Sequence, residues 1–264
     1  MDLSSLDRPE ILETIFPIAY STFYSLIVNR ISKPDVPGYP IEVGAGVKIH
    51  CGFWVSGKES PSFLYFHGNG ETVADYAWIA PFFNERGINL FVADYRGYGS
   101  SDGKPTISNL IGDAGTIFRG FKDIIEKDGF NKDLFIMGRS LGSIPAIEIA
   151  FNYQDEICGL VIESGAANNF RRLWSYLGIS EDATGEASLF LNKVKIRQVR
   201  KPTLIMHGEY DQIISVSEGE ELYQNSGASD KNILIVPDVG HNDIMMKQDL
   251  YFNTIEEFVK AHST

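Results

Sequence analysis

Short apolar runs alternate with amphipathic segments along most of this chain, and this alternation constrains its fold more than any other feature. The runs lack strict polar–apolar alternation, which is typical of strands buried on both faces of a parallel sheet. Ile41–Val43 and Val47–Val55 flank a glycine-rich turn and predict an opening β-hairpin. The strands predicted after it are Phe63–Phe66, Ile88–Ala93, Leu134–Met137, Ile157–Ile162, Thr203–Met206 and Ile233–Val236.

Amphipathic segments between these runs predict the helices. They are Ala74–Arg86, Ile107–Lys127, Leu141–Asn152, Ser217–Gln224 and Leu250–Ala261. A regular strand-then-helix order indicates a doubly wound, mostly parallel central sheet, because parallel strands need crossover connections. The sequence therefore predicts a single α/β domain over residues 41–264.

The interval at about 164–201 departs from the strand–helix alternation, since it is rich in large apolar residues and contains no predicted strand. It is too long and too apolar for a simple connection, and we interpret it as a short helical cap inserted between two strands. Phe170, Trp174 and Tyr176 are its candidate substrate-binding residues. They suit an acyl pocket and the packing of the cap on the core equally well.

Residues 1–40 form a predicted N-terminal helical extension. Asp7 is a plausible N-cap, and Pro9 suits the first helical turn. The apolar stretch that follows is interrupted by Glu13 and Pro17, so we expect it to dock on the domain rather than cross a membrane. Contact with a membrane surface is the alternative for this segment. No secretory signal is apparent, and Cys51 and Cys158 are expected to be buried free thiols, which favours a cytoplasmic location.

The charge balance excludes one class of partner. The chain has 35 acidic against 23 basic residues and a formal net charge of −12. Because a negative surface repels phosphate backbones, no nucleic-acid partner is expected. The sequence leaves the oligomeric state open.

The strongest motif is Gly138-Arg139-Ser140-Leu141-Gly142, between a predicted strand and a predicted helix. This context is that of a nucleophile elbow, in which a strained turn lifts the serine hydroxyl clear of the sheet. Ser140 is therefore the candidate nucleophile. It needs a general base, and the base needs an orienting carboxylate.

His241 is the candidate base, because its loop follows the last predicted strand and can place an imidazole over the sheet edge. Asp211, after the strand Thr203–Met206, is the candidate acid, with Glu163 as runner-up and Glu209 and Asp243 as further rivals. The order Ser140, Asp211, His241 is that expected of a triad built on this kind of sheet.

Acyl transfer also needs donors for the developing oxyanion. One should be the amide of Leu141, directly after the nucleophile. The other should come from the loop His67-Gly68-Asn69-Gly70 after the strand Phe63–Phe66, and Asn69 N–H is the preferred donor.

Together these motifs, with Asp94-Tyr95-Arg96-Gly97-Tyr98-Gly99, His207-Gly208 and Gly240-His241, resemble the α/β-hydrolase superfamily, in particular its BEM46-like, serine-aminopeptidase-like (S33-type) branch. The resemblance runs from about Ile41 to Ala261. It implies the α/β-hydrolase fold, a Ser140–His241–Asp211 triad, an oxyanion hole of the Asn69 and Leu141 amides, and structural roles for Asp94 and Arg96. It implies no metal and no organic cofactor.

We therefore expect an esterase-like serine hydrolase that cleaves a carboxylic ester or related acyl bond of a small-molecule substrate. A peptidase or thioesterase of the same fold is the main alternative among enzymes. A non-catalytic binding protein on a hydrolase fold is the alternative from another class, because fold does not imply function.

Overall fold

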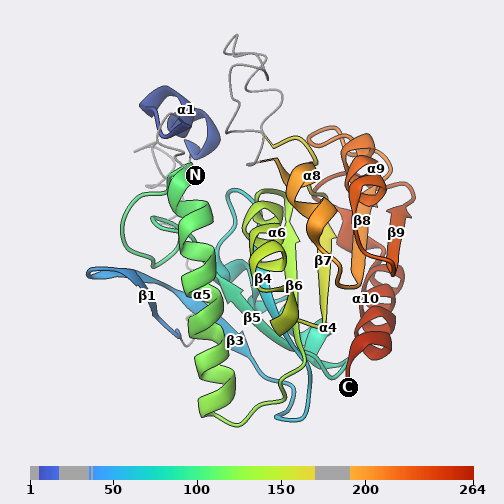
Figure 1. Ribbon diagram of the computed structural model, residues 1–264, viewed down its shortest axis with the longest axis horizontal. Helices are drawn as coiled ribbons and strands as arrows, with labels where there is room; N and C mark the ends of the chain where they lie inside the picture. Colours follow the sequence, from blue (N-terminus) through green and yellow to red (C-terminus); the bar gives the residue numbers. More distant parts are fainter. Residues whose placement is uncertain (1–5, 18–35, 37, 170–190) are drawn as a thin grey trace. The chain divides into compact units, whose positions relative to one another are not determined.

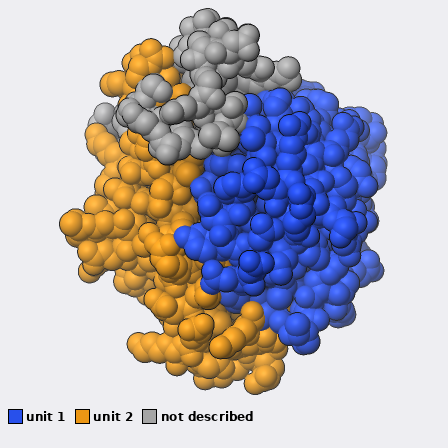
Figure 2. Space-filling model, in the orientation of Figure 1, with its two compact units in different colours: residues 1, 133–264 blue, residues 2–132 orange. Residues whose placement is uncertain are grey.

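The computed structural model describes residues 6–17, 36, 38–169 and 191–264. Figure 1 shows strands and helices in alternation along the chain, and Figure 2 colours the two compact units, residues 2–132 and residues 133–264 with Met1. Each unit combines strands with helices, as the alternation of apolar runs predicted, and the parallel pairs β4–β5, β6–β7, β7–β8 and β8–β9 make the central sheet mostly parallel.

In residues 2–132 the strands form two sheets. β1 (Ile41–Gly44) and β2 (Val47–Ile49) make an antiparallel hairpin. β3 (Cys51–Trp54) pairs antiparallel with β5 (Asn89–Ala93), which pairs parallel with β4 (Ser62–Phe66). The predicted strand Val47–Val55 is thus two strands, because its two halves pair with different partners.

The helices of this unit begin with α1 (Pro9–Ile15). The predicted helix Ala74–Arg86 is instead a 3₁₀ helix, η2 (Val73–Ala77), followed by α4 (Ala80–Asn84). Pro81 in the first turn of α4 has no N–H to donate to a preceding turn, which accounts for the break.

The longest helix, α5 (Ile107–Lys127), has the predicted bounds. The hydroxyl of Thr106 caps it by accepting a hydrogen bond from the amide of Asn109 at 3.0 Å. Its buried positions recur at the three- and four-residue spacing of one helix face: Ile107, Leu110, Ala114, Ile117, Phe118, Phe121 and Ile125.

In residues 133–264 four parallel strands pair in the order β6-β7-β8-β9. They are β6 (Leu134–Arg139), β7 (Gly159–Glu163), β8 (Thr203–Gly208) and β9 (Lys231–Val236). Every residue of β6, β7 and β8 is buried, which explains their uninterrupted apolar sequence. Cys51 is buried, whereas Cys158, just before β7, is only half-buried.

The α-helices of this unit include α6 (Ser143–Asn152), which follows the 3₁₀ turn η3 (Ser140–Gly142), then α8 (Asn192–Lys195), α9 (Val216–Asn225) and α10 (Gln248–His262). α10 packs on the sheet through Phe258, whose ring centroid lies 6.1 Å from that of Phe135 in β6. The described residues of this unit also contain the short 3₁₀ turns η4 (Gln154–Glu156), η7 (Ile196–Gln198) and η8 (Ile244–Met246).

Two predicted regions are described only in part. In the extension, α1 is described and residues 18–35 and 37 are not. In the predicted cap, residues 164–169 and 191–201 are described and contain no strand, while Phe170, Trp174 and Tyr176 lie outside the described residues. Within the ranges that the structure describes, no helix combines the length and the apolarity needed to cross a membrane.

Candidate active site

Ser140 stands at the turn between β6 and α6. Its φ of 52° lies in the left-handed region that residues with a Cβ rarely adopt, so the backbone is strained at this serine. A Cβ at Gly138 would overlap the carbonyl oxygen of Gly142, so only glycine lets the strand and the following turn approach this closely. The local geometry is that of the predicted nucleophile elbow.

The structure brings Ser140, His241 and Asp211 together in a hydrogen-bonded chain. His241 Nε2 lies 3.0 Å from Ser140 Oγ, and His241 Nδ1 lies 2.7 Å from Asp211 Oδ2. Because an ionised carboxylate only accepts, Nδ1 carries the proton and Nε2 is left to accept from the serine hydroxyl. His241 and Asp211 are both buried, so this chain is largely shielded from water.

Asp211 is held in one orientation by four donors. Its Oδ1 accepts the amides of Ile213 at 2.9 Å and Ile214 at 2.8 Å. Its Oδ2 faces His241 and also His207 Nε2, at 3.2 Å. Burial raises the pKa of Asp211, but hydrogen bonds from His207 and His241 outweigh it and hold the pKa well below its usual range. The acid is therefore ionised at any pH at which the histidine can act as a base.

His207 also contacts Asp211, although the sequence named it only as part of the His207-Gly208 motif and gave it no role in the site. It is the second-last residue of β8, four positions before Asp211, and its Nε2 also lies 2.9 Å from the Ile214 carbonyl oxygen. The signal was a histidine four residues ahead of the candidate acid, at the end of a buried strand.

The rival acids have other partners. Glu163 Oε1 lies 3.1 Å from Arg139 Nε, and its Oε2 accepts the Tyr251 hydroxyl at 2.6 Å. Glu209 is exposed and accepts the Asp238 amide at 3.2 Å, and Asp243 Oδ1 accepts the Gly240 amide at 2.6 Å. The contact with His241 Nδ1 belongs to Asp211.

Backbone hydrogen bonds join the loops that carry the acid and the base. The amides of Glu209 and Tyr210 donate to the carbonyl oxygens of Val236 and Val239, at 3.0 and 2.8 Å. The Glu209 side chain adds its bond to Asp238. The two loops extend strands β8 and β9, which are paired in register up to Gly208 and Val236.

The candidate oxyanion donors lie in different units. Leu141 is buried and directly follows Ser140 in η3, within residues 133–264. Asn69 lies in the loop after β4, within residues 2–132, and among the residues that the structure describes no acceptor takes its backbone N–H. An N–H without a protein acceptor is what an oxyanion hole requires.

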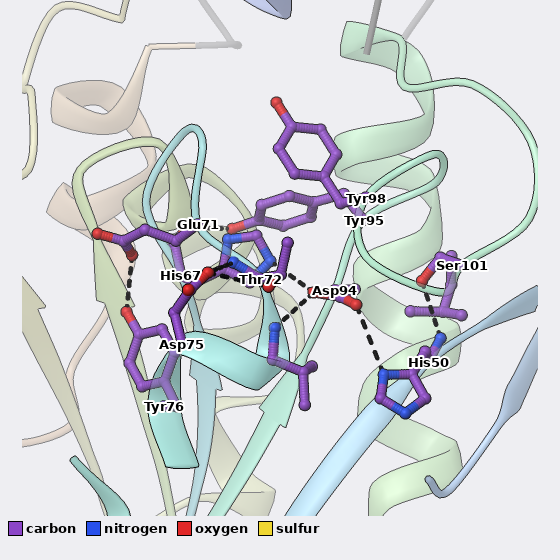
Figure 3. A network of polar contacts seen from close by, with 12 residues as sticks. His50, His67, Glu71, Thr72, Asp75, Tyr76, Asp94, Tyr95, Tyr98 and Ser101 are labelled. Carbon is purple, nitrogen blue, oxygen red and sulfur yellow. Dashed lines mark hydrogen bonds and ion pairs between the residues drawn. The ribbon is translucent and has the colours of Figure 1, made fainter. Parts of the chain in front are cut away.

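A buried polar network fixes the loop His67–Gly70 from inside its unit (Figure 3). Asp94 Oδ1 accepts the Val73 amide at 2.8 Å and lies 3.1 Å from His67 Nε2, while Asp94 Oδ2 lies 3.6 Å from His50 Nδ1. The Tyr95 hydroxyl donates to the His67 carbonyl oxygen at 2.5 Å. Arg96 makes a bidentate ion pair with Asp113 at 2.6 and 2.7 Å, as expected of a structural residue.

Comparisons with known proteins agree with this architecture. The family model described as serine aminopeptidase, S33, matches residues 58–179. The α/β hydrolase domain-containing protein aho-3 of Caenorhabditis elegans is 29% identical over 77% of this chain and 58% of its own length, so the chain spans less than two thirds of that relative. Protein bem46 of Schizosaccharomyces pombe is 29% identical over 77% of this chain and 69% of its own length.

The esterase Pf2001 of Pyrococcus furiosus superposes with a TM-score of 0.69 at 19% sequence identity, over 86% of this chain and 93% of the esterase. The chain has the α/β-hydrolase fold. The match to the bem46 protein and to the S33 model also confirms the resemblance to the BEM46-like, serine-aminopeptidase-like branch of the α/β hydrolases.

The α/β-hydrolase sheet explains why the three residues meet. The carboxyl ends of parallel strands lie at one edge of a sheet, and residues that follow β6, β8 and β9 converge there. Within the described residues, no group of three His, Cys, Asp or Glu side chains is arranged to hold a metal ion.

Gly208 provides a first test of this geometry. A Cβ at Gly208 would overlap the Gly240 carbonyl oxygen and approach that of Val239 at 2.8 Å, so Gly208→Ala pushes the His241 loop away from Ser140. We expect kcat for a nitrophenyl ester to fall about 100-fold, because a displacement of about 1 Å has that cost. Gly112→Ala in α5, where a Cβ meets nothing within 4 Å, is the matched control. Native kcat in Gly208→Ala would show that this loop tolerates displacement.

The Asp94 network should make the free energy of unfolding decrease at acid pH. Burial raises the pKa of Asp94, but hydrogen bonds from His50 and His67 outweigh it and lower the pKa below its usual value. The contribution to stability is therefore complete above the unfolded-state pKa of about 3.9 and is lost as pH falls below it. Urea unfolding from pH 7 to pH 3 should show this decline. It should be shallower in Asp94→Asn and unchanged in Asp155→Asn, which alters an exposed carboxylate.

Proposed function

We propose that this protein is a serine hydrolase that cleaves a carboxylic ester, or a related acyl bond of a small-molecule substrate, through an acyl-enzyme on Ser140. The observation that carries the proposal is the hydrogen-bonded chain from the half-buried Ser140 through His241 to Asp211, with contacts of 3.0 and 2.7 Å. A hydroxyl that faces an imidazole oriented by a carboxylate is the arrangement that activates a serine.

In the first half-reaction the Ser140 oxygen bonds to the substrate carbonyl carbon while its proton moves to His241 Nε2. The carbonyl electron pair moves onto the oxygen, where the Asn69 and Leu141 amides are the proposed donors. Collapse of this intermediate breaks the acyl bond, and His241 protonates the leaving oxygen. Water then attacks the acyl-enzyme by the same route, which regenerates the Ser140 hydroxyl and releases the acid.

The strained backbone at Ser140 supports the same role. The strain of a positive φ at a residue with a Cβ occurs at Ser140, whose hydroxyl faces His241. The turn is fixed further by Ser143, whose hydroxyl donates to the Ser140 carbonyl oxygen at 2.7 Å and accepts from Asn192 at 3.1 Å. These bonds hold the nucleophile in place without using its hydroxyl.

A fluorophosphonate probe tests the proposal. An activated serine forms a bond to phosphorus and expels fluoride, so we expect the adduct to map to Ser140 by peptide mass spectrometry. Labelling should vanish in Ser140→Ala, fall strongly in His241→Ala, and persist in Ser217→Ala, which removes an exposed hydroxyl in α9. No labelling of a folded sample would reject the enzyme and favour a binding protein on this fold.

A further inference from the structure

The C-terminus of α1 meets the loop that carries the proposed oxyanion donor. The Asn69 side-chain Nδ2 donates to the Ile15 carbonyl oxygen at 2.6 Å, and Asn69 Oδ1 accepts the Tyr98 hydroxyl at 2.7 Å. Both polar atoms of the carboxamide are therefore used by the protein. The backbone N–H of Asn69 has no acceptor among the described residues.

The bond to Ile15 satisfies both partners. The last carbonyl groups of a helix have no acceptor role within the helix and need an outside donor. Ile15 is the final residue of α1, and the Asn69 carboxamide supplies that donor. The expected Asp7 cap is absent: Arg8 occupies the N-cap position, and Asp7 Oδ1 accepts the Ser108 amide at 3.2 Å, next to the start of α5.

Packing explains why α1 is present at all. With only seven residues, α1 is too short to be a stable helix in isolation, so its formation depends on docking. Ile11, Leu12 and Ile15 are buried on one face, and Phe16 is fully buried with its ring edge-on to Tyr98, at 6.5 Å between centroids. Phe16 thus contacts the ring, and Asn69 the hydroxyl, of the same tyrosine.

We infer that α1 is a positioning element of the oxyanion hole, which acts by clamping the Asn69 carboxamide between the Ile15 carbonyl and the Tyr98 hydroxyl. The Asp94 network holds the loop at His67, and this clamp holds it at Asn69, whose N–H is the proposed oxyanion donor. The extension then has a catalytic consequence although it carries no reacting group. The inference rests on the function proposed above.

Asn69→Ala is the central variant. It keeps the backbone N–H and removes both bonds of the clamp. We expect kcat for a short nitrophenyl ester to fall about 10-fold or more with little change in KM, because a misplaced donor loses stabilisation of the transition state rather than of the bound substrate. Tyr98→Phe removes one hydroxyl and should give a smaller fall in kcat of the same kind.

Phe16→Ala tests whether α1 acts through the clamp. It removes the ring that packs α1 on Tyr98 and leaves the loop unaltered, so kcat should fall while KM stays near its native value. The double variant Phe16→Ala/Asn69→Ala should be no slower than the slower single variant, because both remove the same clamp. Phe130→Ala, which removes a ring 5.2 Å from that of Phe53, is the matched control and should keep its native kcat.

The outcomes separate this inference from the proposed function. Endpoint labelling of Ser140 by the fluorophosphonate should be complete in all these variants, because the clamp does not touch Ser140 or His241. Labelling together with a native kcat in Asn69→Ala and Tyr98→Phe would overturn the clamp and leave the hydrolase intact. Multiplicative effects in the double variant would overturn the role of α1. If the fluorophosphonate failed to label Ser140 in the unaltered protein, the proposed function itself would be rejected.

Discussion

Asp211→Asn should lower kcat for nitrophenyl ester hydrolysis about 10⁴-fold while the protein stays folded. The asparagine can donate its amide hydrogen to His241 Nδ1, which leaves the imidazole proton on Nε2, where the Ser140 hydroxyl needs an acceptor. The wrong tautomer of His241 alone accounts for the expected loss in kcat, because Ser140 and the proposed oxyanion donors are unaltered in this variant.

Glu209→Gln is the control for that experiment. Glu209 is exposed and two residues from Asp211, and within the part of the chain that the structure describes its side chain bonds only the Asp238 amide. We expect its kcat to stay within about threefold of native, because surface changes away from the hydrogen-bonded chain cost little. A larger loss in Glu209→Gln than in Asp211→Asn would show that the wrong carboxylate has been assigned.

Arg139→Met should reduce the free energy of unfolding by about 3–5 kcal/mol, the usual cost of leaving a buried charge without its partner. Arg139 and Glu163 are both buried, and Nε lies 3.1 Å from Oε1. The guanidinium also donates to the His241 carbonyl oxygen and to Asn242 Oδ1, both at 2.9 Å. Its loss should therefore lower kcat as well, through the loop of the base.

A second change shows which part of that loss is electrostatic. Glu163→Gln removes the unpaired charge but can still accept the Tyr251 hydroxyl. The double variant Arg139→Met/Glu163→Gln should therefore be more stable than Arg139→Met alone in urea unfolding. Equal stabilities would indicate that lost packing, and not an uncompensated carboxylate, is the cause.

Much of this site could be predicted from the sequence because each residue follows a buried strand. Ser140, Asp211 and His241 are marked by glycines and by their order along the chain, and parallel strands end at one edge of a sheet. The sequence pattern could not decide whether Asp211 or Glu163 is the carboxylate that orients His241. In the structure Glu163 pairs with Arg139 and Tyr251, while Asp211 contacts His241, and no spacing in the sequence encodes those contacts.

The errors in the fold prediction have the same origin. Val47–Val55 is continuous in composition, but pairing with β1 and with β5 divides it. Asp7 has the side chain of an N-cap and is used instead by the Ser108 amide, 101 positions away. The Asn69 clamp depends on a main-chain carbonyl, a group that every residue carries, so no side chain marks it in the sequence.

The hydrogen bonds between the loops after β8 and β9 have an evolutionary consequence. The loop of Asp211 is joined to the loop of His241 by main-chain hydrogen bonds from Glu209 and Tyr210 to Val236 and Val239. Any substitution except proline retains the main-chain N–H groups that these bonds need. The spacing between the loops of Asp211 and His241 is thus fixed by the main chain, and most side-chain substitutions in these loops leave it unchanged. Substitutions can therefore accumulate in other segments while the contact between Asp211 and His241 is kept.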